Sequence, residues 1–168
     1  MGASESKENK QTQQKLAEIN YSEIRDRSIM SGQYQARVID LYDGDTMTVA
    51  LFNMDGRLES LKIRLYGVDT PELKGKTSDA GKAAKAEALR YLGACGCIGK
   101  KLGKETALFF RENPCIVCVS FVPEKEKWGR YLAHIRYGNS KVSLAEHLIA
   151  TGHGNAYDGG TKDQSNFE

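Results

Sequence analysis

The chain has 168 residues, of which 40% are hydrophobic and 27% charged, and its net charge is +2. This composition is typical of a globular protein with one domain and a sizeable core, and no apolar run approaches the ~20 residues of a membrane-spanning helix. The first twenty residues are polar and contain no secretory signal, which favours an intracellular, cytoplasmic location.

The first 33 residues carry five basic and five acidic side chains and show no hydrophobic periodicity. Residues 1–33 are therefore expected to form a flexible extension, with at most a helical turn near Ser22–Ser28. The opening run Met1–Ser6 matches the pattern for myristoylation of Gly2, although a processed start would also account for it. Because a single acyl chain binds membranes only marginally, a membrane is expected as a partner only if Gly2 is acylated.

Three strand-like segments come next, separated by two turn signals. Asp43-Gly44 and Asp55-Gly56 are dipeptides typical of hairpin turns. The residues around them alternate between apolar and polar, as on a half-buried strand. These patterns predict an antiparallel meander of three strands over Ala36–Tyr42, Thr46–Phe52 and Leu58–Gly67.

The second half of the chain mixes helices and strands. Ser78–Leu92 is rich in Ala, Lys and Leu, which predicts a helix with Ser78 as its N-cap. Beyond Gly152 the chain is rich in Gly and Asn and is expected to be irregular, with a flexible tail over residues 159–168. Between them we predict a helix over Glu105–Glu112, strands over Cys115–Val122 and Tyr131–Tyr137, and a helix over Val142–Ala150.

The predicted order is three strands, helices, two strands and a helix. A five-stranded barrel with a helix between its third and fourth strands is the OB-fold arrangement, which often binds oligonucleotides. We therefore predict an α+β, strand-rich domain over residues 34–158, built as a five-stranded OB-fold barrel with about three helices. A fold alone does not establish a function.

Basic residues are concentrated in one stretch of the predicted helical region. Between Lys74 and Lys104 there are eight Lys or Arg and only two acidic residues, Asp79 and Glu87, a local charge of +6. Such a segment can meet a phosphate backbone. A solvated, lysine-rich helix face has the same composition.

The four cysteines occur as Cys95-x-Cys97 and Cys115-x-x-Cys118. This spacing is compatible with a zinc site and also with reduced, packed thiols. The second pair lies in an apolar, strand-like run, in which Cys115 and Cys118 would face opposite sides. That orientation favours packed thiols.

Polar residues suited to phosphoryl transfer lie at the ends of the predicted strands. Asp45 begins the second strand and Asp69 follows the third, and two carboxylates with a carbonyl and water suit a hard divalent cation. Glu72, just beyond, is placed to orient or deprotonate a water. Planar guanidinium groups bind phosphate oxygens and stabilise the charge of the transition state, and the candidates are Arg64 and Arg130.

Each of these segments also has a purely structural explanation. Asp43-Gly44 forms a turn whatever else it does. The run from Asp69 to Glu72 would suit a turn followed by a helix cap. Arg64 would suit an exposed cross-strand charge.

Three motifs occur in order along the chain. They are Asp43-Gly44-Asp45-Thr46, the R-x-x-x-x-D-T-P-E run from Arg64 to Glu72, and Lys127-Trp128-Gly129-Arg130. Over roughly Tyr34–Tyr157 they resemble the signature segments of the staphylococcal nuclease family, with Trp128 in place of the usual tyrosine. Any one of these motifs is weak, but three in order are a strong signal.

The resemblance implies a calcium-dependent nuclease, acting in endo or exo mode, that hydrolyses DNA and/or RNA and leaves 3′-phosphates. It implies one Ca²⁺, with Mg²⁺ or Mn²⁺ as alternatives. The implied ligands are the carboxylates of Asp45 and Asp69 and the carbonyl of Thr70, with Asp43 acting through water.

The resemblance also implies roles for six other side chains. Glu72 matches the catalytic glutamate, either as a base or as a group that orients water. Arg64 and Arg130 match the phosphate-binding arginines. The implied substrate-binding residues are Lys127, Trp128 and, by an alignment that needs a gap, Tyr157.

The chain departs from the family between Glu72 and Arg130. Residues 74–102 form a basic helical insertion beside the proposed site, which would clamp the substrate, restrict access or merely decorate the barrel. The alternative functions are a non-catalytic OB-fold module that binds nucleic acid or protein, and a zinc-stabilised interaction domain. The presence of all five acidic and arginine positions argues against the non-catalytic module.

Overall fold

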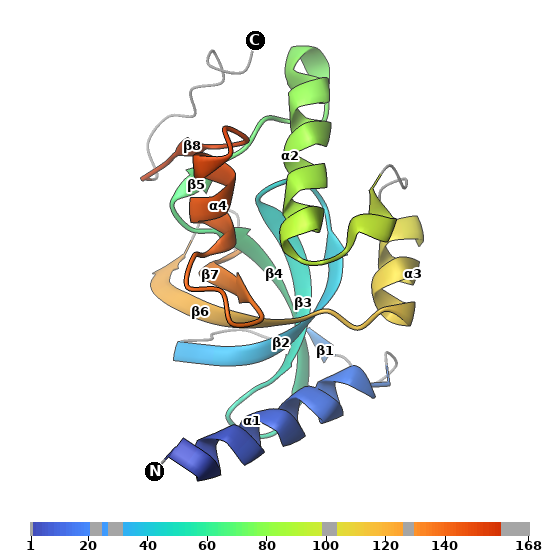
Figure 1. Cartoon of the computed structure of the whole chain (residues 1–168), viewed down its shortest axis with the longest axis vertical. Coiled ribbons are helices and arrows are strands. Elements are labelled where there is room, and N and C mark those ends of the chain that lie inside the picture. Colours follow the sequence, from blue (N-terminus) through green and yellow to red (C-terminus); the bar gives the residue numbers. More distant parts are fainter. Residues whose placement is uncertain (1, 21–24, 27–31, 99–103, 126–129, 159–168) are drawn as a thin grey trace.

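The computed structural model describes residues 2–20, 25–26, 32–98, 104–125 and 130–158. Its fold is mixed α+β and rich in strands (Figure 1). The helices are α1 (Gly2–Ala17), α2 (Ser78–Tyr91), α3 (Lys104–Glu112) and α4 (Leu144–Ala150), with 3-10 turns η2 (Gly75–Thr77) and η3 (Cys95–Cys97). The strands are β1 (Arg25–Asp26), β2 (Gly32–Leu41), β3 (Thr46–Phe52), β4 (Leu58–Leu65), β5 (Val68–Asp69), β6 (Ile116–Lys125), β7 (Tyr131–Tyr137) and β8 (Asn155–Ala156).

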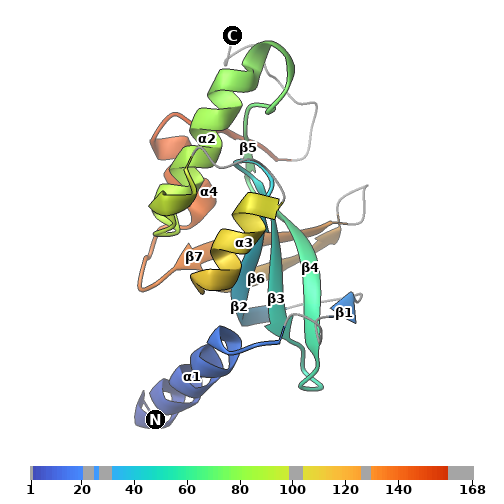
Figure 2. The same cartoon turned by 90° about the vertical axis from the view of Figure 1, so that its right-hand side faces the viewer.

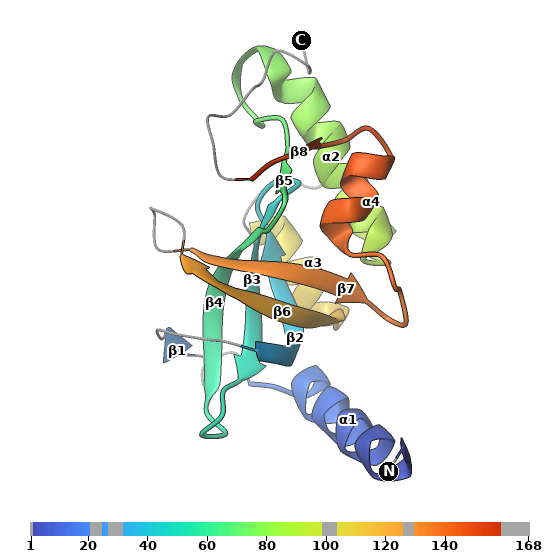
Figure 3. The same ribbon diagram turned by 90° about the vertical axis from the view of Figure 1, so that its left-hand side faces the viewer.

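The main sheet has the strand order β1-β4-β3-β2-β6-β7. β2, β3 and β4 form the predicted antiparallel meander, and β3 and β7 have the predicted bounds. β6 pairs antiparallel with both β2 and β7. β7 also pairs in parallel with β4, where Tyr131–Ala133 lies beside Ile63–Leu65. The sheet therefore curls until two of its long strands, far apart in the strand order, meet (Figures 2 and 3).

The inner face of this curled sheet carries the apolar core, because side chains alternate between the two faces of a strand. α3 packs against β2, and its Phe110 is fully buried. α4 packs against β7 and α2, and its Leu148 is fully buried. α2 and α4 thus lie together at the end of the molecule that holds β5 and β8 (Figures 1 and 3).

The N-terminal segment differs from the flexible extension predicted over residues 1–33. Gly2–Ala17 forms α1, and Arg25–Asp26 pairs with β4 as β1. Leu16, in the last turn of α1, is fully buried. The described structure therefore contains four α-helices where about three were expected, and α1 is docked at its C-terminal end.

Arg37, on β2, holds the ends of two helices. It is 2% exposed. Its Nη1 donates to the carbonyls of Leu16 and Ala17 in α1, at 3.3 and 2.8 Å. Its Nη2 donates to the carbonyls of Phe110 and Arg111 in α3, at 3.1 and 2.8 Å. Carbonyls in the last turn of a helix have no partner within the helix, so one guanidinium satisfies both helix ends.

We expect Arg37→Met to lower the free energy of unfolding by about 2–4 kcal/mol, because it removes the donor from four carbonyls at two helix ends. Urea denaturation of the variant and the wild type measures the change. Arg57→Met, in the exposed turn between β3 and β4, is the matched control and should stay within about 0.5 kcal/mol. Equal midpoints for the two variants would show that Arg37 does not hold α1.

The C-terminal segment is also more regular than predicted. Asn155–Ala156 forms β8, which pairs antiparallel with β5, so that Asn155 lies opposite Asp69. α4 begins two residues later than expected because Ser143 caps it. The Ser143 Oγ accepts from the backbone N–H of Glu146, whose carboxylate accepts from the Ser143 N–H at 2.7 Å, a capping box.

The cysteines whose side chains are described occupy three different environments. Cys115 is buried with its Sγ 3.4 Å from the Leu92 carbonyl oxygen, and burial raises the pKa of its thiol to about 12. The Sγ of Cys118 accepts from Gln33 Nε2 at 2.8 Å, and Cys95 is exposed. Cys115 is therefore a packed thiol.

Among the described helices, none combines the length and the apolar character needed to cross a bilayer.

Candidate functional site

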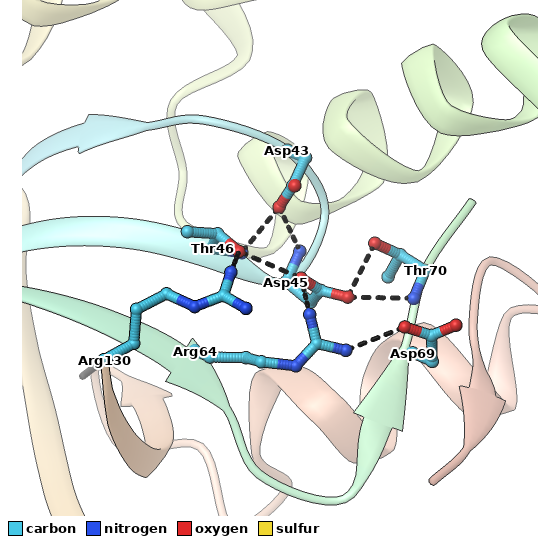
Figure 4. A network of polar contacts seen from close by, with 7 residues as sticks. All are labelled: Asp43, Asp45, Thr46, Arg64, Asp69, Thr70 and Arg130. Carbon is cyan, nitrogen blue, oxygen red and sulfur yellow. Dashed lines mark hydrogen bonds and ion pairs between the residues drawn. The ribbon is translucent and has the colours of Figure 1, made fainter. Parts of the chain in front are cut away.

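The loop between β2 and β3 is built around the side chain of Asp43 (Figure 4). Its Oδ1 accepts hydrogen bonds from the backbone N–H groups of Asp45 at 3.1 Å and Thr46 at 2.7 Å, a turn that Asp favours. The loop ends at Asp45, which is only 2% exposed. A short turn at the surface thus delivers a carboxylate into a buried position at the start of β3.

Arg64, at the end of β4, lies between two carboxylates. Its Nη1 is 2.9 Å from Asp45 Oδ1, and its Nη2 is 2.7 Å from Asp69 Oδ1 (Figure 4). All three residues are 2–3% exposed. The explanation of Arg64 as an exposed cross-strand charge is therefore wrong. Charge-assisted bonds of this kind are strong and directional, so the guanidinium keeps the two acids side by side.

The backbone after β5 completes the surroundings of Asp45. Thr70 donates to Asp45 Oδ2 twice, from its backbone N–H at 2.9 Å and from its hydroxyl at 3.0 Å. Thr70 is itself 3% exposed. Both oxygens of Asp45 are thereby engaged, one by Arg64 and the other by Thr70.

A second arginine approaches from the start of β7. Arg130 Nη1 donates to Thr46 Oγ1 at 3.3 Å, and the Thr46 hydroxyl donates to Asp45 Oδ1 at 3.1 Å (Figure 4). Thr46 belongs to the first motif, but no role was predicted for it. Thr46 lies opposite Arg64 in the β3–β4 pair, so a predicted register for this hairpin would have identified Thr46 as a neighbour of the site.

Tyr157 reaches the same place from the C-terminal segment. Its ring centroid lies 5.7 Å from Arg64 Cζ, within the range of a cation–π contact. Its backbone N–H donates to the Gly67 carbonyl at 3.1 Å, which continues the β5–β8 pairing. The structure thus brings the predicted Tyr157 to the arginine of the network, through a strand that the sequence did not reveal.

Of the other predicted residues, the structure describes Glu72 and Gly2. Glu72 is exposed, follows Thr70 by two residues and is not among the seven residues of Figure 4. Lys127 and Trp128 lie outside the described residues. Gly2 begins α1, at the opposite end of the molecule from β5 and β8 (Figure 1).

Among the residues drawn in Figure 4, three carry a carboxyl group and two carry a guanidinium. Burial, and then the neighbouring carboxylate of Asp45, raises the pKa of Asp43 from 3.8 to about 6, although its hydrogen bonds within the turn oppose the shift. Arg64 pairs with Asp45 and Asp69, Asp43 contacts the backbone of Asp45, and Arg130 reaches only the Thr46 hydroxyl among the contacts drawn in Figure 4. A divalent cation would offset the excess.

The donor atoms also suit such an ion, because Ca²⁺ prefers carboxylate and carbonyl oxygens. Among the described residues, no group of three or more His, Cys, Asp or Glu side chains is close enough to hold a metal ion by itself. An ion at this place would be held by Asp45 and Asp69 and would complete its coordination with the Thr70 carbonyl and water.

Asp43→Asn tests the charge excess, because Asn keeps the Oδ1 acceptor of the turn and cannot ionise. The folded-state pKa of Asp43, about 6, lies above the ordinary value of 3.8. The folded wild type therefore binds the extra proton between these values and loses stability as the pH rises through that window. Without metal ions, we expect the variant to be the more stable protein above pH ~7, by at most about 3 kcal/mol, with no advantage below pH ~3.5.

Urea denaturation across this pH range measures the difference for Asp43→Asn. Asp55→Asn, in the exposed turn before β4, is the matched control for loss of one carboxylate charge. An advantage of Asp43→Asn that stayed constant with pH would contradict the ionisation of Asp43 as its cause.

Comparison with known proteins shows a similarity to another protein but no family. No family model matches the chain. It is similar to an uncharacterized protein of Methanocaldococcus jannaschii, with 31% identity over 143 residues. That match covers 80% of this chain, and the chain spans 62% of the length of the relative.

Proposed function

We propose that this chain is a metal-dependent nuclease of the staphylococcal nuclease type, which hydrolyses phosphodiester bonds of DNA and/or RNA. Its fold would be an OB-fold barrel. The parallel pairing of β4 with β7 supports this, because it joins strands from the two sides of the curled sheet. The strand order, with helices between the third and fourth long strands, supports it as well.

The observation that carries the proposal is the gathering of two arginines and two buried carboxylates from four separate segments. Arg64 contacts Asp45 and Asp69 directly, and Arg130 reaches Asp45 through the Thr46 hydroxyl. A phosphodiester attacked by water accumulates negative charge on its non-bridging oxygens. Guanidinium groups stabilise that charge by planar, paired hydrogen bonds.

The acidic residues divide into two roles. Asp45, Asp69 and the Thr70 carbonyl would hold a Ca²⁺ ion, which when bound supplies Lewis-acid stabilisation of the phosphate. Glu72 is exposed to solvent two residues further on, where it would orient or deprotonate the attacking water. Tyr157, against Arg64, offers a ring on which a base of the substrate would stack.

Cleavage of single- and double-stranded DNA and RNA, with Ca²⁺, Mg²⁺, Mn²⁺ or a chelator, tests the proposal. We expect cutting with Ca²⁺ and no cutting with the chelator. The products should carry 3′-phosphates, which a phosphatase would remove. Tight binding without cutting under any ion would instead make the chain a non-catalytic OB-fold binding module. If the chain neither bound nor cut nucleic acid, the proposal would be overturned.

A further inference from the structure

Three glycines from distant parts of the chain surround residues 68–72, the segment that carries Asp69, Thr70 and Glu72. Gly44 lies in the β2–β3 loop, Gly81 lies in α2, and Gly154 lies between α4 and β8. At each position a Cβ would come closer than 3.0 Å to an atom of residues 68–72. Contacts this short do not occur for real Cβ atoms, so each glycine marks a place where the backbone itself must approach.

The contact at Gly81 is the closest of the three. A Cβ there would lie 2.4 Å from the carbonyl oxygen of Glu72 and 2.8 Å from that of Pro71, both of them backbone atoms. The φ angle of Gly81 is an ordinary helical one, so the position needs glycine for space and not for conformation. Glycine inside a helix costs about 1 kcal/mol relative to alanine. α2 therefore accepts a weaker helix in exchange for contact with this segment.

Neighbouring residues of α2 extend that contact. The hydroxyl of Thr77, which precedes the first turn of α2, donates to the Glu72 carbonyl at 3.4 Å. Ala84, one turn after Gly81 and fully buried, lies 3.1 Å from the place of a Cβ at Gly44. The same face of α2 thus meets both the 68–72 segment and the loop that carries Asp43 and Asp45.

Gly154 closes the opposite side of the segment. A Cβ there would be 2.6 Å from Val68 Cγ2 and 3.2 Å from the Asp69 carbonyl oxygen. This contact comes immediately before β8, whose pairing with β5 holds Asp69 from the same side. Residues 68–72 are thereby enclosed between α2, the β2–β3 loop and the chain that enters β8.

We infer that α2 is a positioning element of the candidate site, and that Gly81 and Gly154 are positioning residues that seat the 68–72 segment. They act through the backbone that carries Asp69, Thr70 and Glu72. The helix of the basic insertion thus has a function at the site, beyond decorating the sheet. The catalytic consequence rests on the proposed nuclease function, whereas the seating of the segment does not.

Gly81→Ala tests the inference, because its methyl group must displace either α2 or the Pro71–Glu72 backbone. Ala83→Gly, at an exposed position of the same helix, is the matched control, since it weakens the helix without adding an atom. Hydrogen exchange at the Thr70 amide, which donates to Asp45, reports the seating directly. We expect exchange at least about tenfold faster in Gly81→Ala than in Ala83→Gly, both without metal ions.

Two functional readouts accompany this measurement. Calcium affinity, measured by calorimetry, should fall about tenfold in Gly81→Ala. Mutation of residues that hold metal ligands in place typically weakens metal binding on this scale. The kcat for cleavage should fall about 10²-fold, with little change in KM, because a displacement of about 1 Å misplaces the reacting groups. Ala83→Gly should lower the melting temperature and leave both readouts close to wild type.

The outcomes separate the two proposals. A Thr70 amide that exchanges equally in Gly81→Ala and Ala83→Gly would overturn the positioning role, whatever the activity. Faster exchange in Gly81→Ala, in a protein whose wild type neither binds Ca²⁺ nor cuts nucleic acid, would keep the positioning role and remove the nuclease function. If Gly81→Ala does not fold, Gly154→Ala decides, because its methyl must displace the buried Val68 side chain or the Asp69 backbone. An unchanged Thr70 amide in Gly154→Ala would then refute the inference.

Discussion

Arg64→Ala is expected to lower the free energy of unfolding of the ion-free protein by about 3–5 kcal/mol, because it removes the countercharge of a buried ionic network. The guanidinium bonds to Asp45 and Asp69 at 2.9 and 2.7 Å, and both acids are almost fully buried. Buried carboxylates that lose their arginine either keep a charge out of water or take up a proton. Both outcomes destabilise the fold at neutral pH.

Calcium is expected to restore part of the stability that Arg64→Ala loses. An ion held by Asp45 and Asp69 would replace the missing positive charge, and binding to the folded state alone stabilises it by mass action. Urea denaturation with and without Ca²⁺ measures this recovery. The recovery in the variant should exceed that of the wild type, in which Arg64 already offsets part of the charge of the acids.

Arg90→Ala is the matched control for the loss of an arginine from an ion pair. Arg90 pairs with Glu87 at 2.8 Å on the surface of α2, where its side chain is 53% exposed. Exposed pairs of this kind contribute about 0–1 kcal/mol. If Arg64→Ala and Arg90→Ala unfolded at the same urea concentration, Arg64 would not be the group that holds the two buried acids.

Arg64→Ala should also lower the rate of phosphodiester cleavage on the order of 10²-fold or more, because a donor to the transition-state charge is lost. The rate must be measured with Ca²⁺ present and well below the melting temperature of the variant, so that unfolding does not contribute. Wild-type cleavage by a folded Arg64→Ala would show that this arginine is structural only.

Glu72→Gln is expected to lower turnover about 10²–10⁴-fold, the range over which a general base or a positioned water contributes to a reaction rate. Gln has nearly the same shape as Glu but cannot accept the proton of the attacking water. Because Glu72 is exposed, the free energy of unfolding should change by no more than about 0.5 kcal/mol. Steady-state kinetics and urea denaturation of the same preparation measure the two quantities.

Glu112→Gln, at an exposed position of α3, is the control for the loss of one surface carboxylate and should leave turnover unchanged. The pH profile of the residual activity separates the two roles open to Glu72. If Glu72 is the base, the acidic limb of kcat/KM disappears in Glu72→Gln; if it only orients water, the limb remains. Full activity in Glu72→Gln would remove Glu72 from the mechanism.

The sequence was sufficient for those elements that local patterns specify. β3 and β7 have the predicted bounds, and α2, α3 and α4 lie within two residues of their predicted ranges. The prediction of Ser78 as the N-cap of α2 is wrong, because Ser78 is the first residue of the helix and Thr77 occupies the cap position. The capping box of Ser143 and Glu146 sets the start of α4 at Leu144, and such a box is a local signal that can be recognised in a sequence. Turn residues and alternation act over a few neighbours, so they can be interpreted without knowing the rest of the fold.

The N- and C-terminal segments could not be predicted in this way. α1 is polar and lacks a strong apolar face, and its C-terminal end is stabilised by Leu16 in the core and by Arg37, a residue of β2. β8 has two residues and exists through its pairing with β5. Both elements depend on contacts between residues far apart in the chain, which short-range patterns do not record.

The same division holds for the candidate site. The sequence by itself determined which acids and arginines lie in short motifs, and the turn at Asp43 follows from its own neighbours. Only the tertiary structure decided that Arg64 is buried between Asp45 and Asp69, that Tyr157 meets Arg64, and that Gly81 in α2 abuts the backbone of Glu72. The physical reason is that burial and charge pairing depend on which strand ends and helix faces meet, and these contacts are set by the way the whole sheet curls.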